Sequence, residues 1–161
     1  MKKRTSNAKR YYLAYGSNLN TVEMKYRCPS AKVIGTAEIS GWRLLFRGNW
    51  MGYLTIEPCE GACVPVAVWE VSPDDESSLD SYEGFPDFYD KQDMRLPVRE
   101  TGSRETSERD AFIYIMKERF SPALPSESYL RTCQGGYRTF GFDETVLEEA
   151  LRATREEMEN E

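Results

Sequence analysis

The chain carries near its start the stretch Tyr11-Tyr12-Leu13-Ala14-Tyr15-Gly16-Ser17-Asn18-Leu19. Its first four residues form an apolar run that predicts a buried strand, and the following Gly-Ser-Asn predicts a turn where that strand ends. Such a turn leaves consecutive backbone N–H groups without ladder partners, so it can direct them, with a hydroxyl and an amide, at one anion. Asn20, with Glu23 three positions later, predicts a capped helix whose N-terminus adds positive potential. The stretch therefore predicts a site for a small carboxylate, although an ordinary strand–turn–helix also fits it.

A second segment predicts a helix that ends in a glutamate. Ser72 is a suitable N-cap, Pro73 suits the first helical position, and Asp75 completes a box-like spacing with Ser72. Gly84 stands where the C-cap is expected, which places Glu83 at the carbonyl end of the helix, beside aromatic residues. The helix dipole and these neighbours disfavour a carboxylate, so we expect a raised pKa for Glu83. A base tuned in this way suits proton transfer near neutral pH, although a solvated glutamate at a helix end also fits.

The two segments together resemble the gamma-glutamylcyclotransferase family. That family has a Tyr-Gly-Ser-Asn-Leu loop after its first strand, and the matching residues are Tyr15, Gly16, Ser17, Asn18 and Leu19. It also has a glutamate just after a Leu-Asp helix, followed by glycine and then tyrosine, and the matching residues are Leu79, Asp80, Glu83, Gly84 and Tyr89. Residues 37–44, 61–71 and 125–137 resemble further family segments, so the resemblance covers nearly the whole chain.

The resemblance implies an α+β fold, a small mixed β-barrel flanked by helices. The length of 161 residues fits one domain. We therefore expect a single gamma-glutamylcyclotransferase-like domain over residues 1–161, with a basic tail at 1–10 and a charged tail at 156–161.

The resemblance also implies an activity, in which a γ-glutamyl group is cyclised to 5-oxoproline and its amine is released. Tyr15 to Leu19 would bind the γ-glutamyl moiety and Glu83 would be the acid–base residue, without a metal or an organic cofactor. Tyr89 would either support Glu83 through its hydroxyl or only pack beside it. The positions of Tyr114 and Lys117 relative to the outer pocket stay open, since neither aligns with the family pattern.

Two questions stay open at this point. The first is whether the chain is instead a non-catalytic binding or regulatory module that kept the barrel and the anion-binding loop. The second is the identity of the leaving amine in the small-molecule substrate. An amino acid, a γ-glutamylated lysine side chain, another amine and a biosynthetic intermediate all fit, and glutathione is less favoured.

The composition limits the partners and the chemistry. A net charge of −6 argues against nucleic-acid binding, and the chain has no histidine, which excludes Ser-His and Cys-His catalysis. The basic cluster within residues 2–10 predicts a solubilising tail. Neither a signal-peptide h-region nor a run of transmembrane length follows it, so we expect a cytoplasmic protein without membrane contact, and a homodimer is possible. Reduced thiols and no zinc site are expected for the four cysteines, which are Cys28, Cys59, Cys63 and Cys133.

The remaining patterns predict short strands and two late helices. The predicted strands are Lys32–Ile39, Trp42–Arg47, Tyr53–Glu57, Cys63–Val71, Tyr89–Val98 and Asp110–Met116. One helix is predicted to begin at Ser126 and another to run from an Asp143 cap to about Met158. The aromatic residues at 42, 46, 50 and 53 fit either a ligand groove or, more simply, the core.

Overall fold

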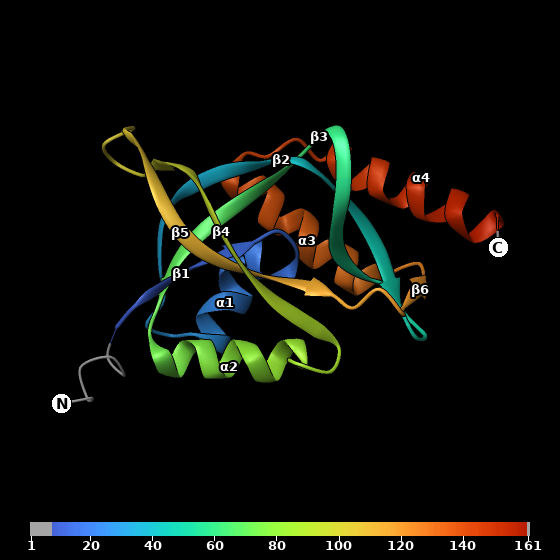
Figure 1. Cartoon of the computed structure of the whole chain (residues 1–161), viewed down its shortest axis with the longest axis horizontal. Coiled ribbons are helices and arrows are strands. Elements are labelled where there is room, and N and C mark those ends of the chain that lie inside the picture. The colour runs from blue at the N-terminus through green and yellow to red at the C-terminus, as the bar shows by residue number, and fades with distance from the viewer. Residues whose placement is uncertain (1–7, 161) are drawn as a thin grey trace.

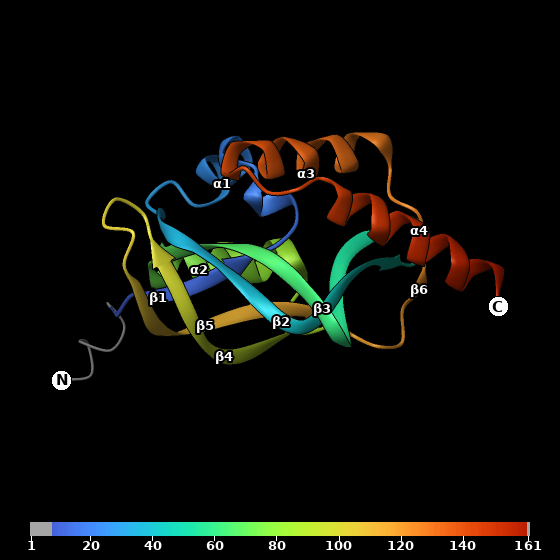
Figure 2. The same cartoon turned by 90° about the horizontal axis from the view of Figure 1, so that it is seen from above.

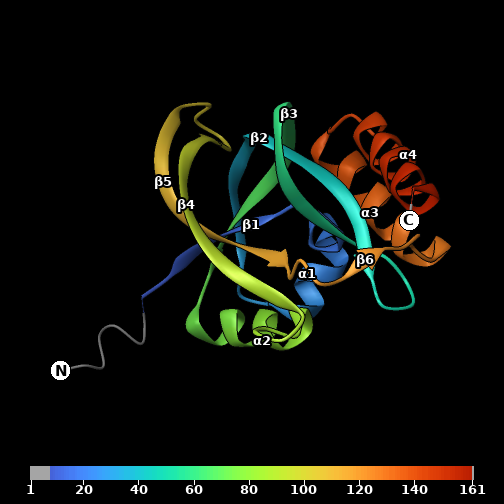
Figure 3. The same cartoon turned by 45° about the vertical axis from the view of Figure 1, so that its right-hand side comes forward.

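In the computed structural model, which describes residues 8–160, strands β1 to β5 close into a mixed barrel. β1 pairs in parallel with β5, every other pairing is antiparallel, and β3 pairs with both β1 and β2 to complete the closure. The barrel is visible in Figure 1 and, turned by 45° about the vertical axis, in Figure 3. The strands are β1 Arg10–Ala14, β2 Lys32–Gly48, β3 Tyr53–Val71, β4 Tyr89–Glu100 and β5 Thr106–Met116, and the short β6 Ser121–Pro122 pairs with the end of β2. The architecture confirms the predicted small mixed barrel.

The segment between residues 32 and 71 forms two long strands, so the prediction of four shorter ones was wrong. β2 and β3 pair antiparallel almost throughout, with a register shift between Ser40 and Trp42. Gly41, which the sequence pattern places between two strands, lies at this shift with a φ of 84°. A bulge bends a strand without ending it, which is why the glycine did not mark a break. The outer half of this hairpin extends beyond the barrel toward β6 and α4 (Figure 1).

The centre of β3 is buried on both faces. Val64, Val66, Ala67 and Val68 have no exposed surface. One face of the strand points into the barrel, and helices cover the outside, so consecutive apolar residues are all removed from water.

Helices surround the barrel on two sides (Figures 2 and 3). α2 lies across one side, and α1, α3 and α4 follow one another along another. Their bounds are α1 Thr21–Arg27, α2 Pro73–Glu83, α3 Glu127–Phe140 and α4 Thr145–Glu159, and a short 3-10 turn covers Ser17–Leu19. None of the helices within residues 8–160 is long and apolar enough to cross a membrane.

The predicted helix boundaries are largely confirmed. Asn20 and Ser126 accept hydrogen bonds from backbone N–H groups of their helices, and Ser72 forms a full capping box. Gly84 ends α2 in the left-handed conformation. At α4 the N-cap is Glu144, one residue later than predicted.

Both predicted tails contain structured residues. Arg10 begins β1 and forms ion pairs with Glu76 at 2.8 Å and Asp93 at 3.0 Å. The lysines and arginine at positions 2–4 lie outside the described residues. At the other end, residues 156–159 continue α4, because Glu157 pairs with Arg43 and Arg47 of β2 at 3.0 and 3.3 Å. The charges of that segment therefore hold a helix against the hairpin.

α3 packs directly on the turn after β1. A β-carbon placed on Gly136 would lie 2.5 Å from the β-carbon of Leu19 and 2.6 Å from its carbonyl carbon. Only glycine permits this approach, so Gly136 of α3 serves close helix–turn packing. The turn is thereby held between the barrel and α3.

This packing predicts the effect of Gly136→Ala. The added methyl group must displace the backbone at Leu19, so we expect a loss of about 2 kcal/mol in the free energy of unfolding. Gly135→Ala is the matched control. Its β-carbon would meet only the side-chain nitrogen of Asn20, at 3.1 Å, and alanine favours the helix by about 1 kcal/mol. Urea denaturation of both variants measures the difference, and equal stabilities would contradict the proposed packing role.

Candidate active site

The turn that follows β1 presents backbone donors, as the sequence predicts. The N–H groups of Leu19 and Asn20 turn back to the carbonyls of Gly16 and Ser17, each at 3.0 Å. Within residues 8–160, the N–H groups of Gly16, Ser17 and Asn18 have no acceptor. Three consecutive donors are therefore available to a ligand.

The side chains of the turn are fixed by neighbouring groups. The Asn18 amide donates to the Tyr12 hydroxyl at 2.9 Å, and its oxygen accepts a bond from Arg27 at 2.5 Å. The Ser17 hydroxyl lies 2.9 Å from that of Tyr82. Because hydrogen bonds fix these side chains, the turn holds its conformation before a ligand binds.

Leu19 differs from the other four residues of the predicted binding loop. Its side chain is fully buried against α3 and does not reach the cavity, whereas Tyr15 to Asn18 line it. Leu19 therefore anchors the turn from behind.

Glu83 faces the turn from the end of α2. Burial raises the pKa of its carboxyl group to about 8, and the nearby Arg27 guanidinium opposes part of this rise. Arg27 itself stacks over the Tyr82 ring at 3.5 Å and pairs with Glu23 at 2.9 Å, so it stands behind Tyr82 and does not line the cavity. The direction of the shift agrees with the prediction, and a group with this pKa exchanges protons readily near neutral pH.

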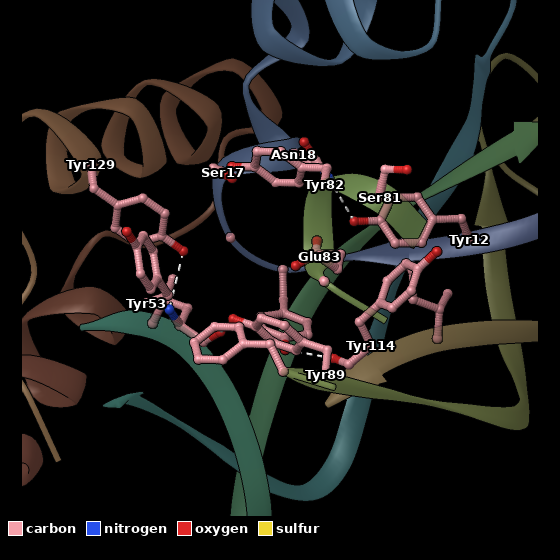
Figure 4. Close-up of a pocket in the computed structure, with 16 residues that line it drawn as sticks. Tyr12, Ser17, Asn18, Tyr53, Ser81, Tyr82, Glu83, Tyr89, Tyr114 and Tyr129 are labelled. Atoms are coloured by element: carbon pink, nitrogen blue, oxygen red, sulfur yellow. Dashed lines mark hydrogen bonds between the residues drawn. The ribbon is translucent and has the colours of Figure 1, made fainter. Parts of the chain in front are cut away.

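Glu83 and the turn share one cavity of about 390 Å³, a size that accommodates a small molecule. Among the described residues that line it, Glu83 is the only charged side chain. Figure 4 shows Glu83 near the middle, with the turn on one side of it and a ring of aromatic residues around it. The tyrosines of the lining are Tyr12, Tyr15, Tyr53, Tyr82, Tyr89, Tyr114 and Tyr129.

Three of these tyrosines use their hydroxyl protons inside the protein. Tyr15 donates to the carbonyl of Tyr114 at 2.6 Å, and Tyr89 donates to the carbonyl of Leu54 at 2.8 Å. Tyr114 donates to Asp80 at 2.6 Å, and Asp80 is in turn paired with Lys91 at 2.8 Å. Since each proton is committed, these hydroxyls can meet a ligand only as acceptors.

Two other tyrosines have the opposite polarity. The Tyr12 hydroxyl accepts its bond from Asn18, and the Tyr129 hydroxyl accepts from the N–H of Leu54 at 3.1 Å. No hydrogen bond donated by either hydroxyl occurs within residues 8–160, so both protons are available to a ligand. Burial raises the pKa of both phenols well above the usual value, and Glu83 adds to the rise, so they stay protonated. The Tyr114 hydroxyl therefore offers the cavity a hydrogen-bond acceptor. The hydroxyls of Tyr12 and Tyr129 and the N–H groups of the turn offer donors.

The structure resolves the positions that the sequence left open. Tyr89 lines the cavity but its hydroxyl bonds Leu54, so it does not support Glu83 through that group. Tyr114 lines the cavity, whereas Lys117 pairs with Asp90 at 2.6 Å and does not line it. Of the four aromatic residues considered for a groove, only Tyr53 reaches the cavity. Phe46 is buried and Trp50 is 94% exposed.

Tyr12, Tyr82 and Tyr129 were missed as site residues. Tyr82 precedes Glu83 in the same helix turn and Tyr12 belongs to the quoted stretch, so proximity to the motifs could have marked both. No local pattern marks Tyr129, which reaches the cavity only because α3 packs on the turn.

The cysteines lie outside the cavity, and all four are free. Cys28 and Cys133 are buried, and burial raises the pKa of each thiol to about 12. Neither is a nucleophile near neutral pH.

The raised pKa of Glu83 predicts a pH-dependent stability difference. The unfolded chain ionises Glu83 near its ordinary pKa of 4.5 and the folded chain only near 8, so the wild type loses stability as pH rises between these values. The Glu83→Gln variant cannot ionise at this position. The difference between its melting temperature and that of the wild type should therefore shift in favour of the variant as pH rises from 5 to 9. Asp74→Asn, at an exposed position of the same helix, should show a nearly constant difference. A Glu83→Gln difference that does not change with pH would contradict the raised pKa.

Comparison with known proteins identifies the family of the chain. The family model described as "Gamma-glutamyl cyclotransferase, AIG2-like" matches residues 12–131. A Bos taurus protein named gamma-glutamylcyclotransferase is 31% identical over 134 residues, which cover 77% of this chain and 68% of the relative. The matching protein of Mus musculus is also 31% identical, over 135 residues.

Solved structures show the same relationship. One titled gamma-glutamyl cyclotransferase superposes with a TM-score of 0.74 at 26% identity, over 89% of this chain and 86% of that one. An uncharacterized protein of Homo sapiens superposes with a TM-score of 0.72 at 27% identity, over 88% and 86%. The protein is therefore a member of the gamma-glutamyl cyclotransferase, AIG2-like family and an enzyme of the gamma-glutamylcyclotransferase type.

Proposed function

We propose that the enzyme converts a γ-glutamyl amine into 5-oxoproline and the free amine, with Glu83 as general acid and base. One observation carries this proposal. A single carboxyl group with a pKa of about 8 faces a row of free backbone donors across a cavity of substrate size. A proton acceptor and a row of N–H donors in one cavity fit the ammonium and carboxylate groups of an α-amino acid.

The polarity of the cavity supports one orientation of the γ-glutamyl group. The α-carboxylate bonds the free N–H groups of Gly16 to Asn18. The α-ammonium group lies toward Glu83 and the Tyr114 hydroxyl, both of which accept hydrogen bonds. The γ-carbonyl oxygen then points toward the free Tyr129 proton, which lies beside Gly16. Each polar group of the substrate is matched by one of opposite character.

The reaction needs one proton carrier and no water. Ionised Glu83 takes a proton from the α-ammonium group, and the free α-nitrogen attacks the γ-carbonyl carbon of the same molecule. A C–N bond forms to close the five-membered lactam, and the C–N bond to the leaving amine breaks as Glu83 returns the proton to that nitrogen. Glu83 then carries a second proton from the α-nitrogen to the amine in the same way, so in total the α-nitrogen loses two protons and the leaving amine, released as an ammonium ion, gains two. Because attacking and attacked groups belong to one molecule, the enzyme contributes mainly pose and proton transfer.

Glu83→Gln tests the role of the carboxyl group. Gln keeps the shape and cannot carry a proton, so we expect kcat to fall at least about 100-fold while substrate still binds. The measurement is mass-spectrometric detection of 5-oxoproline from a panel of γ-glutamyl amines and γ-glutamyl amino acids, with binding followed by calorimetry. Asp74→Asn removes a carboxylate from the same helix outside the cavity and should keep full turnover. Full turnover by Glu83→Gln would refute the assignment of the base.

The same panel separates the enzyme from a binding module on this fold. A folded wild type that binds γ-glutamyl compounds and forms no 5-oxoproline from any of them would favour the module.

The pH dependence of the rate follows from the pKa of Glu83. The active form of the free enzyme is ionised, so kcat/KM should rise with pH and level off with a midpoint near 8. Bound substrate places an ammonium group beside the carboxylate and favours its ionised form, so the midpoint for kcat should lie lower. Steady-state kinetics between pH 5 and pH 9 measure both curves, and a kcat/KM that is flat over this range would contradict Glu83 as the base.

A further inference from the structure

One side of the cavity is built from three aromatic rings. Tyr53, Phe88 and Tyr129 line it on the side of Glu83 opposite to Tyr114, and Figure 4 shows Tyr53 and Tyr129 there. The Tyr53 ring meets Tyr129 edge-on at 5.1 Å and Phe88 edge-on at 6.2 Å, each with an interplanar angle of 87°. We call these three residues the aromatic wall. Apart from the hydroxyl of Tyr129, nothing in the proposed reaction requires aromatic rings at this place.

The aromatic wall is held in position from behind. Tyr129 accepts a hydrogen bond from the backbone N–H of Leu54. Phe88 packs against Phe120 with a distance of 4.5 Å between ring centroids, and against Tyr89 with a distance of 5.1 Å. Only Tyr53, at 39% exposure, faces solvent to a large extent. A fixed apolar surface beside an open cavity is a binding surface, because it gains free energy when an apolar group covers it.

The orientation of the γ-glutamyl group places the leaving amine on this wall. Its amino-acid end is held by the turn, Glu83 and Tyr114, so the scissile bond points to the other side of Glu83. The departing amine then lies between the aromatic wall and the solvent at Tyr53.

The absence of cationic side chains from the described cavity lining disfavours one class of leaving group. No lysine or arginine is among the described residues that line the cavity. The guanidinium of Arg119 lies over the Phe120 ring at 4.8 Å, outside the cavity lining, and donates to the carbonyl of Asp87. A leaving amino acid would bring an ionised carboxylate to this apolar side, where its lost hydration is not replaced.

We propose that the leaving amine carries an aromatic or bulky aliphatic body and no carboxylate, and that this body binds on the aromatic wall. The inference rests on the proposed function and names its substrate class, a γ-glutamyl amide of a neutral apolar amine. Tyr53 and Phe88 are the specificity-determining residues, since they contact the amine and take no part in proton transfer.

Four substrates with the same γ-glutamyl group test this class. They are the γ-glutamyl derivatives of phenethylamine, phenylalanine, ethylamine and alanine. The first two differ only by a carboxylate and so do the last two, while the phenyl ring separates the first pair from the second. We expect kcat/KM for the phenethylamide to exceed that for the ethylamide by about tenfold or more, from burial of the ring. It should also exceed that for γ-glutamyl-phenylalanine by at least about tenfold.

Variants of Tyr53 locate the effect. Tyr53→Ala should reduce the ratio of kcat/KM between phenethylamide and ethylamide about fivefold, whereas Tyr53→Phe, which keeps the ring, should preserve it. Tyr26→Ala is the matched control, because Tyr26 is 91% exposed and lies outside the cavity. It should leave the ratio unchanged.

The outcomes separate this inference from the proposed function. Cyclisation of the ethylamide as fast as the phenethylamide, or of γ-glutamyl-phenylalanine faster than either, would overturn the substrate class and keep the reaction. A strong preference for the γ-glutamyl derivative of a diamine would mean that the rings attract a cation, which also overturns it. Cyclisation of no γ-glutamyl compound by the folded protein would refute the proposed function and this inference with it.

Discussion

The contact between α3 and the turn after β1 is the constraint on which the site depends. The missing β-carbon of Gly136 lets the helix approach the backbone of Leu19, and the buried Leu19 side chain holds the turn from behind. This contact fixes the three free N–H groups, and it also brings Tyr129 beside Gly16. The arrangement of these N–H groups and one side of the cavity therefore depend on a single packing contact.

The site combines burial with a shortage of charge. Glu83 is the only charged side chain in the described cavity lining, and its burial raises its pKa to about 8, within the pH range in which we propose that it exchanges protons. An ion pair within the cavity would have lowered the pKa and made the base weaker. Arg27 lies close enough to limit the shift but is separated from the cavity by Tyr82. The same burial makes the ionised form of Glu83 unfavourable for folding, so function and stability oppose each other here.

The tyrosines give the cavity hydrogen-bond donors and acceptors at fixed positions without adding charge. A phenol is both donor and acceptor, and its outward role depends on which bond it makes inside the protein. The Tyr114 hydroxyl donates a hydrogen bond to Asp80, whereas the Tyr129 hydroxyl accepts one from the N–H of Leu54. Two chemically identical groups therefore present opposite hydrogen-bonding character to a ligand. A neutral lining of this kind orients a polar substrate and leaves the pKa of the base high.

Local patterns in the sequence determined the elements and the two motifs. Capping residues such as Ser72 and Gly84 act over a few positions, so helix ends were predictable, and Glu83 followed from its place at one of them. The continuity of β2 through Gly41 was not predictable, because a bulge depends on the pairing with the neighbouring strand. The aromatic wall also required the tertiary structure. Tyr53, Phe88 and Tyr129 lie on separate segments, and only closure of the barrel and docking of α3 place their rings around one cavity, since such contacts leave no periodic trace along the chain.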